Sequence, residues 1–568
     1  MGIDSYTSDY HNRIAPGGVV KREWQNGMMS DNTRKYEYLT TNLMMNFNKQ
    51  FGDFNVNLML GTSTDKTDVK TTNRMAWNFQ VDNVLAYGNA PEANKKFAYN
   101  LSSKRLVSVF GELRADWKNT IFATVTGRND WTSTLPIENR SYFYPSVSGA
   151  IVFSQFLQDQ GILDRDAVLS FGKIRASWAR VGKDTSPYET NTALWPVGTF
   201  LNGMTGIGNS WTRGNPGLKP ETTQSTEYGI ELRFFKNRLK LDYAYYTNDS
   251  YDQIISPRGA QSTGYIFCSV NVGNVLNKGM ELSISGTPIE TKDWTWETGI
   301  NMAGNRGKLE NLPKGMDIMY VTDVQYGNAQ AASYSPGAFM GISGSRWQRT
   351  DDGRVIIGKD GMPKVESGKF CVGNREPKFT GGWNNTLTWK DWSFNMLWEF
   401  RVGGHVYNNT ARTMMSAGTS EFSADVRDQK LVIEGVDTDG NDYYAEYETG
   451  KTYVIDGIEK SGYKIIQSYY TGAYASETAN YLTKVNSLRL RSLSLSYNLP
   501  KAFLAKTKVI KRASVQASAT NVLLFTNYKG DPEAAASGSG VGGSSSVGFE
   551  SCGVPSTAGF TFGVNLTF

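Results

Sequence analysis

The chain has few cysteines and few histidines. Its three cysteines, Cys268, Cys371 and Cys552, are far apart in 568 residues and show none of the spacings of zinc sites, redox motifs or disulfide frameworks. The two histidines, His11 and His405, both expected in loops, are too few for a multi-histidine metal site and make a Ser/His/Asp triad improbable. We therefore expect no catalytic residues, no metal ion and no cofactor.

Charge of one sign and long hydrophobic runs are also scarce. A net charge of +5, spread evenly, does not indicate a nucleic-acid partner. No stretch approaches about 18 consecutive apolar residues, which excludes a transmembrane helix but not a transmembrane β-barrel, whose strands are only half apolar. Residues 1–18 lack the basic start and apolar stretch of a secretory signal, so we expect an exported protein to be represented here by a fragment.

Aromatic residues and glycine, by contrast, are plentiful. Aromatics make up 12% of the chain, and there are 58 glycines, a composition that favours an all-β fold. Segments of about ten to fourteen residues alternate apolar with polar side chains, the length that crosses a bilayer as a tilted strand. The clearest lie at residues 225–235, 238–246, 294–302 and 392–400.

The polar side of two of these segments carries charges. Glu231 and Arg233 share the polar side of one segment, and Glu399 and Arg401 share that of another. We predict that these four residues face a wet lumen and contact the substrate. We also expect substrate contacts from the long segments at residues 307–375 and 405–481. Glu227 lies on the same side as Glu231, but four residues along a strand separate the two carboxylates too widely for a glycosidase pair.

The links between the candidate strands alternate between short and long. About fifteen strands can be counted from Tyr36 onward. Short links are expected at residues 50–53, 118–120, 236–237, 288–293 and 390–391, with two longer ones at 156–168, where we expect one or two helical turns, and 500–511. Long links are expected at residues 64–103, 183–221, 250–275, 307–375, 405–481 and 526–557. Alternation alone also fits a sandwich of two sheets, but the alternating links favour an outer-membrane barrel with short periplasmic turns and long extracellular loops.

Parity then gives an orientation. If the short turns face the periplasm, residues 1–35 form an extracellular loop and residues 36–568 form the strands and loops of the barrel. Single-chain barrels of this kind have an even number of strands, so an odd count predicts that an upstream part is missing.

Smaller motifs give local expectations. The sequence DTDGND at 437–442 could hold calcium, but its glycine stands at the fourth position, and a plain Asp/Gly turn is favoured. A change of phase in LRLRSLSLSY predicts either a β-bulge near Arg491 and Ser492 or a strand that rises clear of the membrane. The basic cluster at 506–513 is expected in a solvated turn. Aromatic residues near predicted strand ends suggest membrane-interface girdles: Trp117, Trp131, Tyr142, Phe143, Tyr144, Trp389 and Trp392.

Six blocks of the sequence together resemble the SusC/RagA family of TonB-linked outer-membrane transporters. They are SFGKIRASWARVGKD, NPGLKPETTQSTEYGIELRFFKNRLKLDYAYY, NVLNKGMELSISGTPIETKDWTWETGINM, EPKFTGGWNNTLTW, YLTKVNSLRLRSLSLSYNLP and ATNVLLFTNYKGDPE. The resemblance covers nearly the whole chain and implies a 22-stranded barrel, of which about seven strands, the N-terminal plug and the TonB box are not in this chain. It also implies a SusD-like surface lipoprotein, the TonB complex and the outer-membrane lipids of a Bacteroidetes-type bacterium as partners.

The segment FTFGVNLTF is predicted to be a barrel strand with its aromatic side towards lipid. Resemblance to outer-membrane barrels implies that Phe560, Phe562 and Phe568 form the signal read by the barrel-assembly machinery. The sequence thus predicts a TonB-dependent importer of oligosaccharides or peptides. The alternative is an all-β glycan-binding protein, soluble or at the cell surface, without transport activity.

Overall fold

The computed structural model describes residues 1–17, 22–164, 167–199, 203–504, 509–534 and 547–568. It is an all-β protein whose main sheet contains 18 strands. No helix in these ranges is long and apolar enough to cross a membrane. The chain divides into two compact units, which are described separately: Met1–Ala150, Ser177–Ser225 and Ser250–Val272 form unit 1, and Ile151–Ala176, Thr226–Asp249 and Gly273–Phe568 form unit 2.

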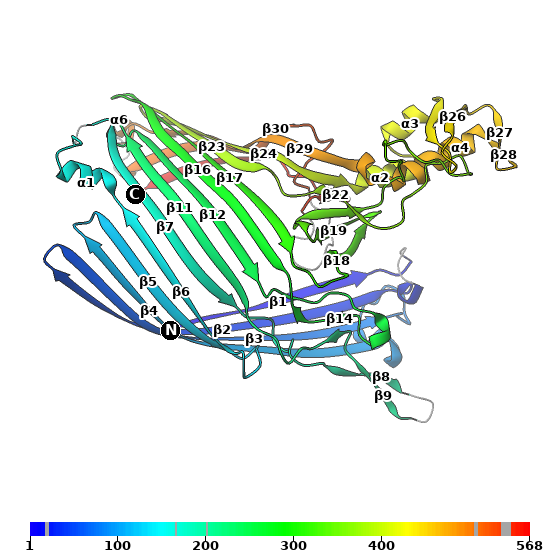
Figure 1. The fold of residues 1–568 in the computed structure, drawn as a ribbon, viewed down its shortest axis with the longest axis horizontal. Helices are drawn as coiled ribbons and strands as arrows, with labels where there is room; N and C mark the ends of the chain where they lie inside the picture. Colours follow the sequence, from blue (N-terminus) through cyan, green and yellow to red (C-terminus); the bar gives the residue numbers. More distant parts are fainter. Residues whose placement is uncertain (18–21, 165–166, 200–202, 505–508, 535–546) are drawn as a thin grey trace. The chain divides into compact units, whose positions relative to one another are not determined.

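Unit 1 is built on a run of long antiparallel strands, β1 to β5 (Figure 1). Its elements are β1 (Gly2–Ile14), η1 (Arg22–Trp24), β2 (Met28–Phe51), β3 (Phe54–Trp77), η2 (Tyr87–Asn89), η3 (Glu92–Asn94), β4 (Lys95–Trp117), β5 (Ile121–Thr132), most of β6 (Ser141–Ile151), β8 (Leu194–Thr199), β9 (Thr205–Asn209), β10 (Thr212–Arg213), β13 (Ile254–Ile255), η4 (Gln261–Thr263), β14 (Phe267–Cys268) and β15 (Val270–Asn271). Strands β7 (Leu169–Lys183), β11 (Glu221–Phe234) and β12 (Leu239–Tyr251) each contribute residues to both units.

Unit 2 holds the second run of paired strands, in the order β16, β17, β23, β24, β29, β30 and β32. Its elements are α1 (Phe153–Asp159), β16 (Asn274–Glu290), β17 (Trp294–Glu310), β18 (Ile318–Tyr326), β19 (Ala329–Tyr334), β20 (Gly337–Ala338), β21 (Gly341–Gly344), β22 (Phe370–Asn374), β23 (Phe379–Trp389), β24 (Trp392–Asn408), α2 (Asn409–Ala417), α3 (Glu421–Arg427), β25 (Leu431–Val436), β26 (Asp442–Tyr447), β27 (Thr452–Ile455), β28 (Ile458–Ser461), α4 (Gly462–Ser468), η5 (Tyr469–Ala473), α5 (Tyr474–Ser476), η6 (Thr478–Tyr481), β29 (Leu482–Asn498), α6 (Lys501–Leu504), β30 (Arg512–Thr526), β31 (Phe549–Glu550) and β32 (Gly559–Thr567).

The strand register of unit 2 separates an apolar face from a polar one. One row of directly paired residues across β23, β24, β29, β30 and β32 is Leu387, Phe394, Leu495, Ala517 and Phe562. The neighbouring row is Thr386, Asn395, Ser494, Ser518 and Thr561. Successive residues of a strand point to opposite faces, so the alternation predicted from the sequence is confirmed as two faces of one sheet.

The predicted loop at the start of the chain is wrong, because residues 2–14 form β1 and pair with residues 28–40 of β2. His11 therefore lies in a strand, and so does His405, in β24. Apart from the two-residue strands β20 and β31, the described part of the main sheet has sixteen strands. The predicted strand number of about fifteen is confirmed, but the parity argument, which needed an odd number, fails.

The expected long loop at 64–103 is also wrong, because β3 runs to Trp77 and β4 begins at Lys95. The prediction rests on strands no longer than the length that crosses a bilayer. A strand that continues into water carries polar side chains on both faces and loses its alternation. Asp65 and Lys66, which are successive residues of β3 and therefore lie on opposite faces, are an example.

Two local predictions are confirmed. Helix α1 lies in the link before β7, and the β-bulge lies at Arg491, where the register of β29 shifts against both β24 and β30. The predicted short links are also present, at residues 52–53, 118–120, 235–238, 291–293 and 390–391. The predicted basic turn at 506–513 lies partly outside the described residues.

The aromatic girdle stays a prediction, and the structure shows only where some of its residues lie along their strands. Trp389 and Trp392 lie at the strand ends beside a short link, and Trp389 stacks on Trp294 at 5.5 Å. Tyr142 and Tyr144 lie near the start of β6, but the Tyr144 hydroxyl donates to Asp130 at 2.5 Å on the polar side. Only the residue between these tyrosines, Phe143, can face outward, because strand neighbours alternate.

Candidate functional site

Two of the predicted site residues, Glu231 and Arg233 of β11, contact each other. Arg233 Nη2 lies 2.6 Å from Glu231 Oε1, and the guanidinium carbon lies 4.6 Å from the centre of the Phe171 ring. The pair thus presents hydrogen-bonding groups on the polar side of β11 while its charges balance.

A second arginine, Arg175 of β7, was missed by the sequence analysis. It lies 2.8 Å from Asp242 of β12 and 3.6 Å from Glu227 of β11. Gly229 makes room for it, since a Cβ atom there would lie 2.5 Å from the guanidinium. Glu227 and Glu231 are therefore each paired with a different arginine. This arrangement is that of a charged lumen surface, because the two carboxylates of a glycosidase act together on one bond.

These side chains border a hollow on the polar face of unit 2. Its volume is about 590 Å³, and it extends over β12, β16, β17 and β23. Arg175, Asp242, Glu281, Ser283 and Asn301 supply its polar lining, and Gly382, which pairs with Asn301, leaves it open on the β23 side. A hollow with this lining can hydrogen-bond hydroxyl, amide and charged groups alike.

The other two predicted residues, Glu399 and Arg401 of β24, do not contact each other. Glu399 Oε2 accepts hydrogen bonds from Arg491 at 2.5 and 2.9 Å, whereas Arg401 Nε donates to the carbonyl of Gly403 at 3.1 Å. Among the described residues, no hydrogen bond or ion pair joins Glu399 or Arg401 to Glu231. The bulge explains the partner of Glu399: Arg491 is the extra residue of β29, and its insertion places it on the polar face two residues from Arg489.

Arg489 makes a buried ion pair with Asp531, from the segment that follows β30. The side chains are only 4% and 7% exposed, and Arg489 also lies 3.5 Å from Glu533. Glu533 in turn reaches Arg491 at 2.8 Å. The pair Arg489 and Arg491 thus contacts the pair Asp531 and Glu533, and in each pair the two residues are separated by one other. This matching spacing is visible in the sequence. The network fixes residues 527–534 to the polar face.

The pH below which the contact between Asp531 and Arg489 is lost can be predicted. Burial alone would raise the pKa of Asp531, but hydrogen bonds from the Glu533 and Ser556 backbones, with the charge of Arg489, hold it below its ordinary value of 3.8. A carboxylate whose pKa is lower in the folded state than in the unfolded state stabilises the folded state at pH values above its ordinary pKa. This stabilisation is lost as the pH falls through the folded-state pKa. Hydrogen exchange of residues 527–534, corrected for its intrinsic pH dependence, should be unchanged from pH 8 to 5 and rise only below 3.8. In the Asp531→Asn variant, hydrogen exchange of this segment should be faster at every pH. Release of the wild-type segment near pH 6 would contradict a lowered pKa for Asp531.

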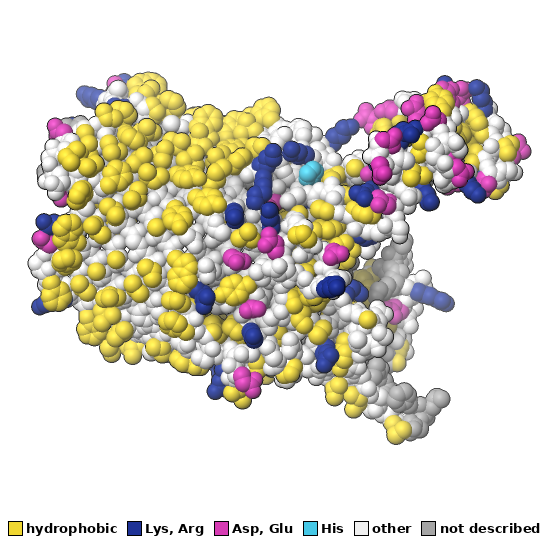
Figure 2. Space-filling model, viewed as in Figure 1, with side chains coloured by type: hydrophobic (Ala, Val, Ile, Leu, Met, Phe, Trp, Pro, Cys, Tyr) yellow, Lys and Arg dark blue, Asp and Glu magenta, His cyan; other side chains and the backbone are white. Residues whose placement is uncertain are grey.

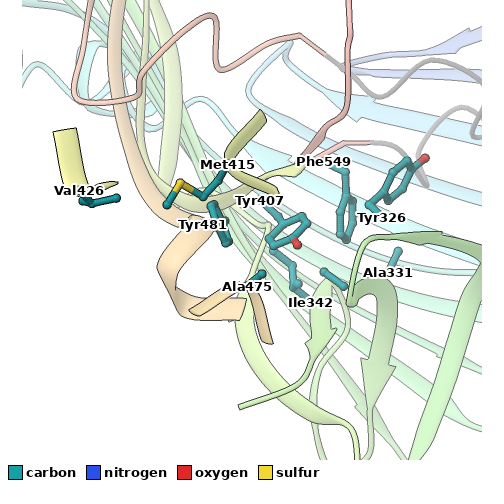
Figure 3. Close-up of a cluster of buried hydrophobic side chains, with 10 residues drawn as sticks. Tyr326, Ala331, Ile342, Tyr407, Met415, Val426, Ala475, Tyr481 and Phe549 are labelled. Atoms are coloured by element: carbon teal, nitrogen blue, oxygen red, sulfur yellow. The ribbon is translucent and has the colours of Figure 1, made fainter. Parts of the chain in front are cut away.

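An aromatic cluster organises the long links beyond β24 (Figure 3). Tyr407 at the end of β24 and Phe549 of β31 are fully buried, and Phe549 stacks on Tyr326 at 5.0 Å. The Tyr407 hydroxyl donates to Asn328 at 2.7 Å. Because β31 pairs with the end of β24, the last long link returns across the same core as β18, β19 and β21.

The link at 405–481, from which we expected substrate contacts, contains a folded module. Helix α4 and strands β25 to β27 pack around Ile357, Leu431, Ile433, Tyr447 and Ile465, whereas α2 and α3 contribute Met415 and Val426 to the aromatic cluster. Figure 2 shows acidic and basic side chains crowded over this module. A pocket of about 370 Å³ opens between α2, α3 and α4, with Arg427, Tyr463 and Gln467 among its lining. Substrate binding by this module remains a prediction.

The segment at 437–442 forms the favoured hairpin turn between β25 and β26. Asp437 Oδ1 accepts from the backbone nitrogens of Asp439 and Asn441, each at 2.9 Å. The turn prediction is confirmed.

The three phenylalanines of the predicted assembly signal lie at the end of the chain with exposed side chains. Phe560 and Phe562 belong to β32, and Phe568 follows it. Their apolar side continues the apolar face of β30. Their role in assembly remains a prediction.

Comparison with known proteins agrees with this architecture. Residues 3–522 match the family described as TonB dependent receptor-like, beta-barrel. The chain is 27% identical to TonB-dependent receptor P3 of Formosa agariphila, over 97% of this chain and 53% of that protein. It is 24% identical to TonB-dependent receptor SusC of Bacteroides thetaiotaomicron, over 75% of this chain and 41% of that protein. The chain thus spans about half the length of the curated relatives it matches.

Among solved structures, the RagAB peptide transporter is similar in fold. The TM-score is 0.73 at 18% identity, over 100% of this chain and 59% of that one. At this level of identity the likeness concerns the fold alone.

Proposed function

Because the chain belongs to the TonB-dependent receptor-like β-barrel family, we propose that it is the barrel part of a SusC-like outer-membrane importer of oligosaccharides or peptides. The observation that carries the proposal is the register of unit 2, which sets an uninterrupted apolar row beside a polar one across five strands. Such a sheet matches lipid on one side and a wet lumen on the other.

The charged residues of the polar face would line the path of the substrate. Glu231 with Arg233, and Glu399 with Arg491, are ion pairs whose remaining lone pairs and N–H groups can bind passing hydroxyl or amide groups. Because each charge already has a partner of opposite sign, the substrate would bind weakly, and substrates of either charge would bind alike. Weak binding allows the substrate to pass through the barrel. We do not expect any of these residues to act as a catalyst.

The remaining parts of the machine would lie outside this chain. We propose a plug domain with a TonB box upstream, a barrel of 22 strands in the whole protein, a SusD-like lipoprotein as lid, and the TonB complex as the energy source. Similarity to SusC and to the fold of the RagAB transporter supports these partners. In this arrangement the short links face the periplasm, and the long links receive substrate outside.

The test uses cells that express the whole gene containing this chain. The protein should sediment with the outer membrane and need detergent for extraction, and uptake of fluorescent oligosaccharides or oligopeptides should cease when TonB is depleted. Recovery of native protein in the aqueous supernatant would instead support a glycan-binding protein without transport activity. Uptake that persists without TonB would overturn the proposed mechanism while leaving the barrel intact.

A further inference from the structure

A groove opens on the apolar face of unit 2, at the short-link end of β12, β16 and β17. Its volume is about 440 Å³. Phe235, Leu239, Ile284 and Ile300 line it, with side chains 37% to 54% exposed. In Figure 2, hydrophobic side chains cover much of this face.

The groove exists because its floor lacks side-chain bulk. Gly286 of β16 and Thr298 of β17 are paired in the strand register and lie between the larger apolar residues. A Cβ atom on Gly286 would lie 2.7 Å from the carbonyl oxygen of Arg238, so this position also lets the neighbouring turn approach. The floor is thus open to an apolar chain, while the walls are aliphatic and aromatic.

Arg238 closes the end of the groove with a fixed guanidinium. Its Nη2 atom donates to the carbonyls of Thr287 and Pro288 at 3.0 and 2.8 Å, and its Nε atom donates to Thr287 at 3.2 Å. Among the described residues, no carboxylate pairs with it, and Nη1 has no hydrogen-bond acceptor. Two carbonyls therefore hold the fork in place while one nitrogen remains available for an anion.

We propose that this groove binds one glycerophospholipid of the periplasmic leaflet, with an acyl chain on the apolar floor and its phosphate at Arg238 Nη1. The proposal rests on the orientation given above, in which the short links face the periplasm. A phospholipid complements both the apolar floor and the guanidinium. Its acyl chain covers apolar side chains that would otherwise contact loosely packed lipid, and its phosphate is an acceptor for Arg238 Nη1. Lys236, Glu290, Lys292 and Asp293 lie in or beside the neighbouring turns, but Arg238 is the one charged residue among the described residues that line the groove, so selectivity is assigned to this guanidinium.

A second groove serves as an internal control. It also has a volume of about 440 Å³ and lies on the apolar face of β29, β30 and β32, lined by Leu495, Val515, Ala517 and Phe562. Among the described residues that line it, none is an arginine or a lysine. Because no cation is there to hold a headgroup, it should retain no lipid once the protein has been stripped of lipid.

The test measures phospholipid retained by the full-length protein, purified in a mild detergent, stripped of lipid and incubated with equal amounts of phosphatidylglycerol and phosphatidylcholine. Native mass spectrometry then counts the bound molecules. One lipid per chain should be retained, with phosphatidylglycerol favoured by about fivefold, the factor that one interfacial cationic side chain confers. Arg238→Gln should abolish the preference, and Arg238→Lys should restore part of it. Ile284→Trp, which fills the groove, should remove the lipid.

Two matched variants act as controls. Lys292→Gln removes a charge from the neighbouring turn, and Val515→Trp fills the second groove; both should retain the wild-type preference. Circular dichroism checks that each variant keeps its sheet. An unchanged preference in Arg238→Gln, or retention of detergent only, overturns the proposal. Retention of lipopolysaccharide in place of phospholipid in the natively purified protein overturns it as well. Transport that continues alongside such a result would leave the proposed function standing.

Discussion

Replacing Arg489 by methionine is expected to release residues 527–534 from the polar face of β24 and β29. The side chain is nearly fully buried and pairs with Asp531, which is buried to a similar degree. Removing one member of a buried pair leaves the other charge uncompensated, at a cost of about 3 kcal/mol. Hydrogen exchange of this segment should therefore accelerate by about 100-fold. Trypsin should also cleave at Lys529 in the variant and not in the wild type.

The double variant separates charge burial from packing. In Arg489→Met with Asp531→Leu, both charges are gone, and most of the protection should return because an apolar pair of similar size replaces the ion pair. Arg354→Met is the matched surface control. Arg354 lies 2.7 Å from Asp442, but both side chains are exposed. Loss of this pair should therefore change hydrogen-exchange protection by less than about threefold. Equal effects of Arg489→Met and Arg354→Met would show that the burial of the Arg489 pair is unimportant.

The strands inside the apolar band could be predicted from the sequence, and those outside it could not. Alternation is enforced only where the two faces of a strand meet different media, as at Phe394 and Asn395. Where β1 pairs with β2, both faces carry polar residues, and the period that identifies a strand disappears. The bulge at Arg491 was predictable because it interrupts an alternation that is otherwise strict.

The site was less predictable than the strands. Alternation placed Glu231, Arg233, Glu399 and Arg401 on the polar side, but it could not say which partner each would find. The partner of Glu399 depends on a bulge in another strand, and that of Arg489 on a segment more than forty residues further along the chain. The module at 405–481 was taken for a loop because its helices have fewer than ten residues, too short for a helical period to stand out.

The second large effect is expected from Phe562→Lys in β32. Its side chain is 82% exposed in the protein alone, and its position is near the middle of a nine-residue strand. On a lipid-facing wall, a lysine at this depth should lower the free energy of unfolding in phospholipid vesicles by about 2 to 4 kcal/mol. Urea titration of the refolded full-length protein measures the change.

The size of this effect separates the two proposed functions. If the apolar face of β32 met water, as in a glycan-binding protein outside the membrane, replacing an exposed phenylalanine by lysine would change stability by less than about 0.5 kcal/mol. Thr561→Lys is the matched control, since Thr561 continues the polar row through Ser518 and should tolerate the charge. Phe562→Leu keeps the apolar surface but removes the ring, so reduced assembly with unchanged stability would assign this phenylalanine to the assembly signal. A large loss in Phe562→Lys alone requires that the side chain meets lipid, because only a medium of low polarity penalises the new charge so strongly.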